Sequence, residues 1–189
     1  MKLSEYSKLD ATALAALIRQ KEISPKEALD TALEALRQVN GRLNAVVDYT
    51  YDYGLKQIDK GIDYEAPFCG VPFVLKDCGG EAAGIRATMG TRLTGKGVYA
   101  GEDSTLFKRM KKAGVIVAAT AATSELCIDS STETIRNGPT RNPWNTEFSP
   151  GVQRRFRSPG CGRGRTDGSW KRRRRIHTDP CLHVWNRGI

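Results

Sequence analysis

The charge of this chain changes abruptly near Gly151, and the change limits which part of the chain can build a core. Residues 1 to 150 carry 19 basic and 19 acidic side chains, whereas residues 151 to 189 carry 11 basic and 2 acidic ones. A segment rich in charge and glycine, with few aliphatic residues, cannot bury enough apolar surface to fold. We therefore expect a folded part, residues 1–151, and a disordered basic tail, residues 152–189.

Within residues 1–151, helix and strand patterns alternate. The clearest helix opens with Ser24 as N-cap, Pro25 at the first position and Glu27 completing a capping box, and it should end at Asn40-Gly41. Other helices are expected from Asp10 to about Lys21, over 51–61, and from an Asp103 or Ser104 cap to Gly114. Strands are expected in LNAVVDY, CGVPFVLKDCGG and VIVAA. This order indicates an α/β protein with at least partly parallel strands.

Several kinds of site and location are disfavoured. The chain has five cysteines, an odd number without CxxC spacing, so we expect free thiols rather than a zinc site or a disulfide framework. No stretch approaches the roughly 18 apolar residues of a membrane span, and no apolar run follows the first lysines. We expect a cytoplasmic protein with neither metal nor cofactor and no membrane partner.

Lys76 is the charge with the most chemical interest. It ends an apolar strand, where its ammonium could be held partly dry, and a desolvated lysine can act as a base. A strand-end lysine that simply reaches into water is the more general interpretation. Composition and pattern do not distinguish a base from a solvent-exposed lysine. The residues around Lys76 favour the base only because they resemble a known family.

Four segments, GVPFVLKD, DSTLFKRMKKAGVIVAAT, SEL and GPTRNPWNTEFSPG, resemble in order and spacing the N-terminal part of the amidase signature family. The match covers roughly residues 5 to 151. It implies an incomplete α/β/α fold with a mixed sheet, a small-molecule amide substrate and hydrolysis without a cofactor. It also implies that Lys76 is the base of a Ser-cisSer-Lys triad. The segment looks closest to nylon-oligomer hydrolases and general amidases.

The two serine motifs of that family are missing where they belong. A Gly/Ser segment of the form GGSSGGS should follow NPW, and a GGSIRIP-like segment should follow later. The chain has VQRRFRS and KRRRRIHTDP in these places. The chain as written therefore lacks both serines that the resemblance requires.

Codon arithmetic offers an explanation. If bases two and three of each codon are joined to base one of the next, residues 152–157 can read SSGGS, and residues 169–183 can read HGSDGGGSIRIPAS. Tryptophan has one codon, so Trp170-Lys171 and Trp185-Asn186 must each give glycine, which the family pattern has there. We interpret residues 152–189 as an out-of-frame translation of an amidase gene.

Three functions follow. The first is a truncated, inactive amidase fragment whose open apolar faces and strand edges make it poorly soluble. The second is a small basic nucleic-acid-binding protein, suggested by the net charge of +9, although we expect no specific nucleic acid. The third is a full-length amidase, if the frame change is an error of the sequence. The particular amide and the oligomeric state stay open.

Overall fold

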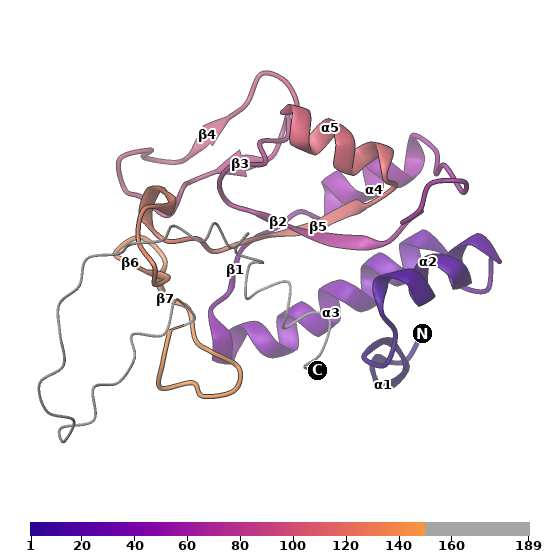
Figure 1. Cartoon of the computed structure of the whole chain (residues 1–189), viewed down its shortest axis with the longest axis horizontal. Helices are drawn as coiled ribbons and strands as arrows, with labels where there is room; N and C mark the ends of the chain where they lie inside the picture. The colour runs from indigo at the N-terminus through magenta and orange to yellow at the C-terminus, as the bar shows by residue number, and fades with distance from the viewer. Residues whose placement is uncertain (150–189) are drawn as a thin grey trace, which may run out of the picture.

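The computed structural model describes residues 1–149, in which a small sheet lies between helices (Figure 1). The helices are α1 (Leu3–Tyr6), α2 (Ala11–Arg19), α3 (Pro25–Leu43), α4 (Tyr51–Asp59), α5 (Thr105–Lys112) and the 3-10 turn η1 (Glu125–Cys127). The strands are β1 (Val46–Tyr49), β2 (Pro72–Lys76), β3 (Arg86–Ala87), β4 (Val98–Tyr99), β5 (Ile116–Ala121), β6 (Glu133–Thr134) and β7 (Gly138–Pro139). The expected disordered tail, 152–189, lies outside the described residues, and the boundary at 151 stays a prediction.

The main sheet is mixed and has the order β1-β5-β2. Strand β5 runs parallel to β2 and antiparallel to β1. All six residues of β5 are buried, as expected for a central strand that is covered on both faces. The expectation of an α/β protein with partly parallel strand order is confirmed.

Neighbouring residues of β5 contribute to different cores because side chains alternate across a strand. Ile116 packs with Leu29 and Leu33 of α3, whereas Val117 packs with Phe107 of α5. Figure 1 shows α3 and α5 on opposite sides of the sheet, with α2 lying against α3. The described residues therefore form helix, sheet and helix layers, the α/β/α arrangement that the sequence resemblance implies.

Helix α4 replaces a strand along part of the β5 edge. The N–H of Val117 donates to Oε1 of Gln57 at 2.8 Å, and Nε2 of Gln57 donates to the carbonyl of Val115 at 3.4 Å. The helix can come this close because residue 54 is glycine. A Cβ there would lie 2.9 Å from the Val117 carbonyl oxygen and 2.9 Å from Leu29 Cδ2. Gly54 lowers intrinsic helix stability, but the contact between α4 and the sheet requires it.

The predicted helix starts are confirmed. The side chain of Asp10 accepts from Ala13 N at 2.8 Å, that of Ser24 from Glu27 N at 3.1 Å, and that of Ser104 from Phe107 N at 3.2 Å. Of the two caps considered for α5, Ser104 is the one used. In each case the donor lies three residues after the cap, so the bond is local.

The predicted end of α3 at Asn40-Gly41 is wrong. The helix continues to Leu43, and Asn44 adopts a left-handed conformation with φ of 50°. The Nδ2 of Asn44 donates to the carbonyl of Asn137 at 2.8 Å, and Thr140 Oγ1 donates to the Asn44 carbonyl at 2.9 Å. Asn40 still contributes locally, because its Oδ1 accepts from Ala45 N and Val46 N at 2.8 Å each. Local bonds and contacts with a distant segment therefore hold the helix end together. Over residues 1–149, no helix has the length and apolar character needed to cross a membrane.

Candidate active site

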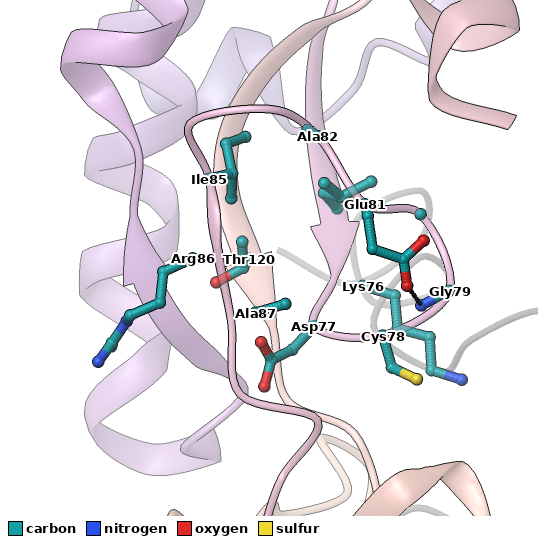
Figure 2. A pocket seen from close by; sticks show the side chains of 12 residues that line it. Lys76, Asp77, Cys78, Gly79, Glu81, Ala82, Ile85, Arg86, Ala87 and Thr120 are labelled. Atoms are coloured by element: carbon teal, nitrogen blue, oxygen red, sulfur yellow. Dashed lines mark hydrogen bonds between the residues drawn. The ribbon is translucent and has the colours of Figure 1, made fainter. Parts of the chain in front are cut away.

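Lys76 is the last residue of β2, where it pairs with Ala121 of β5. Its side chain is exposed, so in residues 1–149 Lys76 reaches into water, and the alternative of a partly dry ammonium is not seen in this part of the chain. Lys76 is exposed because β2 ends at the carboxyl edge of the sheet, where the chain turns into the 77–81 loop (Figure 2). This edge is where α/β proteins commonly bind ligands.

Asp77, the next residue, is the buried charge of this region, with 1% of its surface exposed. Its carboxylate accepts from Thr88 N at 2.7 Å, from the Thr88 hydroxyl, and from Gly90 N at 3.4 Å. Its own N–H donates to the Ala121 carbonyl at 3.0 Å. A buried carboxylate is tolerated when it is hydrogen-bonded in this way. Asp77 thereby attaches the Gly/Thr-rich loop, residues 84–97, to the strand end that carries Lys76.

The Gly/Thr-rich loop is attached in turn to the segments after β5. Thr91 Oγ1 donates to Glu125 Oε1 at 2.6 Å, and Leu126 N donates to the Met89 carbonyl at 2.8 Å. Arg136 Nη1 donates to the carbonyl of Thr91 at 2.9 Å. Met89 and Leu126 have φ values of 53° and 51°, an uncommon left-handed conformation for non-glycine residues. The loops around Lys76 therefore support one another through directional bonds.

A pocket beside Lys76 is lined by side chains from both parallel strands and from the loop between them, among them Cys78, Glu81, Ile85 and Thr120 (Figure 2). Glu81 Oε1 accepts from Gly79 N at 3.1 Å, which bends the loop at the pocket rim. Within residues 1–149, no group of three or more metal-ligating side chains is present. Cys69, Cys78 and Cys127 are free thiols, as expected, and Cys161 and Cys181 lie outside the described residues.

The segment that should lead into the first serine motif forms a closed turn. Asn142 N donates to the Phe148 carbonyl at 2.8 Å, and Asn142 Oδ1 accepts from Trp144 N at 2.9 Å. Both missing serine motifs fall beyond this turn, outside the described residues. Of the serines present, Ser104 uses its hydroxyl to cap α5. Lys76 is the single residue that sequence reasoning placed in the site, and the resemblance did not show that Asp77 anchors its loop.

The comparisons with known proteins define the class of the chain. The Amidase family model matches residues 27–152, which is most of the region that carries the layers and the Lys76 loops. The chain belongs to the Amidase family.

Its relatives have differing names. The chain is 35% identical over 151 residues to a subunit of the glutamyl-tRNA(Gln) amidotransferase of Methylacidiphilum infernorum, covering 80% of this chain and 29% of that protein. It is 33% identical over 143 residues to the 6-aminohexanoate-cyclic-dimer hydrolase of Paenarthrobacter ureafaciens, covering 75% of this chain and 28% of that one. The chain thus spans less than a third of the length of these relatives.

A solved structure of 6-aminohexanoate cyclic dimer hydrolase, complexed with substrate, has the same arrangement. It superposes with a TM-score of 0.67 and 32% identity over 76% of this chain and 29% of that one. A bacterial aryl acylamidase of the amidase signature family gives a TM-score of 0.66 at 25% identity, over 75% of this chain and 30% of that one. The mixed α/β fold is therefore the corresponding part of an amidase signature fold.

Proposed function

We propose that residues 1–149 are the lysine-bearing part of an amidase signature hydrolase, and that Lys76 is the base of its Ser-cisSer-Lys triad. The observation that carries the proposal is the position of Lys76. It lies at the carboxyl edge of parallel strands β2 and β5, and the buried Asp77 holds the following loop. A base must have a defined position relative to its partners before it can transfer a proton efficiently.

The reaction is hydrolysis of a carbon-nitrogen amide bond. The nucleophilic serine attacks the carbonyl carbon while the cis serine passes the nucleophile's proton towards neutral Lys76. Backbone N–H groups stabilise the oxyanion, the amine leaves with a proton, and water then releases the acyl group. The Lys76 side chain is exposed in residues 1–149, so the groups that would enclose it in the enzyme have to come from outside this part of the chain.

We also propose that the 189-residue chain does not perform this reaction, because residues 152–189 are read out of frame. The codons of 152 and 176 are where the shifted frame offers the two serines, and this chain has Val152 and Ile176 there. Removing one member of such a triad costs several orders of magnitude in rate. The substrate of the in-frame enzyme is a small amide, and the likeness to a cyclic-dimer hydrolase makes a linear or cyclic aminohexanoate amide the first compound to test.

The test compares three proteins: the 189-residue chain, the product of the gene with its frame restored at codon 152, and that product carrying Lys76→Ala. We expect hydrolysis of 6-aminohexanoate cyclic dimer or a simple aryl amide in the second protein alone, with a loss of at least about 1,000-fold on Lys76→Ala. Turnover by the 189-residue chain that Lys76→Ala abolishes would overturn the proposed inactivity. Full activity of the frame-restored Lys76→Ala protein would overturn the role of Lys76.

Two further measurements separate the remaining interpretations. Resequencing the gene across the codons for Ser149 to Gln153 decides whether the frame change is present in the gene or is an error in its sequence. A gel-shift titration of the 189-residue chain with RNA and DNA tests the basic-protein alternative. Tight, salt-dependent binding would favour that alternative, and we expect weak binding without sequence preference.

A further inference from the structure

One edge of the main sheet has no neighbouring strand. In the order β1-β5-β2, strand β2 has β5 on one side and, among residues 1–149, no strand on the other. Phe73 packs against the cluster below α5 and Val74 against the cluster below α3. Both side chains are nevertheless only half-buried, and Lys76 at the strand end is exposed, whereas all six residues of β5 are buried. Strand β2 is therefore covered on its faces but open along one edge.

The main chain of β2 presents hydrogen-bonding groups along this open edge. At the start of the strand, the carbonyl of Val71 accepts from Ile116 N at 2.9 Å. At its end, Asp77 N donates to the Ala121 carbonyl at 3.0 Å. Successive residues of a strand direct their N–H and C=O groups to opposite sides, so odd-numbered residues bond to β5. The N–H and C=O groups of Val74, in the middle of β2, therefore point away from β5.

The other edge strand, β1, has features that discourage strand pairing. A β-bulge shifts its register on β5 between Val46 and Asp48. Asp48 also binds Arg86, whose Nε donates to Oδ2 at 2.9 Å and whose Nη2 donates to Oδ1 at 2.6 Å. Bulges and charged side chains are common protections of edge strands. Apart from Pro72 at its start, β2 lacks them: its middle is Phe-Val-Leu, and the extra residue in its pairing with β5 lies on β5.

The partner for this edge lies outside residues 1–149. The chain covers 29% of the solved cyclic-dimer hydrolase that shares its arrangement, so most of the length of such a protein is not part of it. Residues 151–189 carry 11 basic and 2 acidic side chains, and burying such charges between two apolar layers is costly. An extended, apolar segment from the remaining part of an amidase signature fold suits the edge better.

We propose that the open edge of β2 binds such a segment, and that the 189-residue chain takes up the remaining part of the fold as a separate polypeptide. The added strand accepts from Val74 N, donates to the Val74 carbonyl and covers the exposed parts of Phe73 and Val74. Residues that follow it then enclose Lys76. Naming the partner rests on the proposed function, but pairing along the edge can be measured without any activity.

Hydrogen exchange at single-residue resolution tests the edge directly. In the 189-residue chain alone, the Val74 amide should exchange at least about 100-fold faster than the Leu75 amide, which points to β5. In the frame-restored protein, the two amides should be protected to within about tenfold of each other. The product of codon 152 onwards in the restored frame, added as a separate polypeptide, should co-elute with the 189-residue chain and protect Val74 to the same degree.

A substitution at the edge gives a second measurement. Val74→Pro removes the N–H that points away from β5, a change that edge strands tolerate. It should weaken binding of the added polypeptide at least about tenfold, because main-chain bonds supply affinity in strand addition. The control is Val74→Thr, which keeps the N–H and the branched shape and should weaken binding less than about threefold. Urea unfolding of each variant alone checks that the sheet still forms, and the exchange of the unsubstituted chain decides if Val74→Pro does not fold.

The outcomes separate the possible occupants of the edge. Protection of Val74 in the 189-residue chain alone would overturn the proposal: at every concentration it would mean that residues 150–189 fill the edge, and only at high concentration that a second copy does. Rapid exchange of Val74 in an active frame-restored enzyme would also overturn it. An inactive frame-restored protein in which Val74 is protected would count against the proposed function and support the pairing.

Discussion

Two regions of this molecule are stabilised in different ways. Between the helices, the side chains that pack on β5 are apolar, and we call this region the apolar layer: Leu29, Leu33, Phe107, Ile116 and Val117. Past the carboxyl ends of β2 and β5, five buried side chains are polar, and we call this region the polar loops: Asp77, Thr88, Thr91, Thr123 and Thr134. Lys76 lies where the two regions meet.

The difference between apolar packing and hydrogen bonding explains how the position of Lys76 is specified. Apolar burial contributes most of the free energy of folding, but it is non-directional. Hydrogen bonds contribute less net free energy each, yet they fix distances and angles, and a buried group left without its partner is costly. We therefore expect substitutions in the apolar layer to act mainly on global stability. Substitutions in the polar loops should act mainly on local order near Lys76.

The largest expected effect lies in the apolar layer, at the fully buried Phe107. Phe107→Ala should reduce the free energy of unfolding by about 3 to 5 kcal/mol, because it removes buried surface and leaves a cavity. Urea unfolding of the full chain, followed by far-UV circular dichroism, measures the change. The matched control is Leu106→Ala on the same helix, where the side chain is 49% exposed and we expect less than about 0.5 kcal/mol. Equal losses would contradict the assignment of Phe107 to the core.

The second-largest expected effect on stability lies in the polar loops, at the buried Asp77. Asp77→Ala should cost about 2 to 3 kcal/mol, because it leaves the N–H groups of Thr88 and Gly90 buried without their acceptor. Hydrogen exchange should show faster exchange of these two amides and little change at Val117. Glu102→Gln, at a side chain that is 86% exposed, is the control for losing a carboxylate and should change stability little. Unchanged exchange at Thr88 would mean that Asp77 does not hold the loop.

Substituting two helical glycines separates the effect of close packing from the effect of helix propensity. Gly54→Ala should destabilise the chain by about 1 to 2 kcal/mol, because the new methyl group would overlap Leu29 and the Val117 carbonyl. Gly41→Ala, in α3 with no atom within 4 Å of the new Cβ, should instead stabilise it by about 0.5 to 1 kcal/mol. Opposite signs in urea unfolding are the expected result. Stabilisation by both substitutions would show that α4 does not press on β5.

The smallest effect concerns a single hydroxyl group of the polar loops. Thr91→Val removes the hydroxyl that donates to Glu125 and accepts a longer bond from Leu93 N, and it should cost about 1 kcal/mol. Its control is Thr12→Val, at an exposed position of α2, for which we expect less than about 0.5 kcal/mol. Proteolysis of the full chain should speed up at residues 125–127 in the first variant alone. If both variants behave alike, the bond between Thr91 and Glu125 does not order this turn.

Much of the fold could be predicted because its signals are local. The caps at Asp10, Ser24 and Ser104 bond to groups three residues away, and the structure confirms all three. Strand β2 could be recognised as a short apolar run between glycines, and strand β5 as a short apolar run that follows Gly114. Lys76 was found through resemblance, and its role stays a prediction. The anchoring role of Asp77 was not evident, although a carboxylate directly after a buried strand could have suggested it.

By itself, the sequence determined where α2, α3, α4 and α5 begin, which runs form the three strands of the main sheet, and that the chain changes character near Gly151. Only the tertiary structure decided features that depend on distant partners. Asn44, the residue after α3, donates to the carbonyl of Asn137, 93 residues away, and Gln57 completes the edge of β5 through Val117, 60 residues away. Local bonds can be inferred from a few neighbouring residues. Bonds between distant segments exist only once packing has brought those segments together.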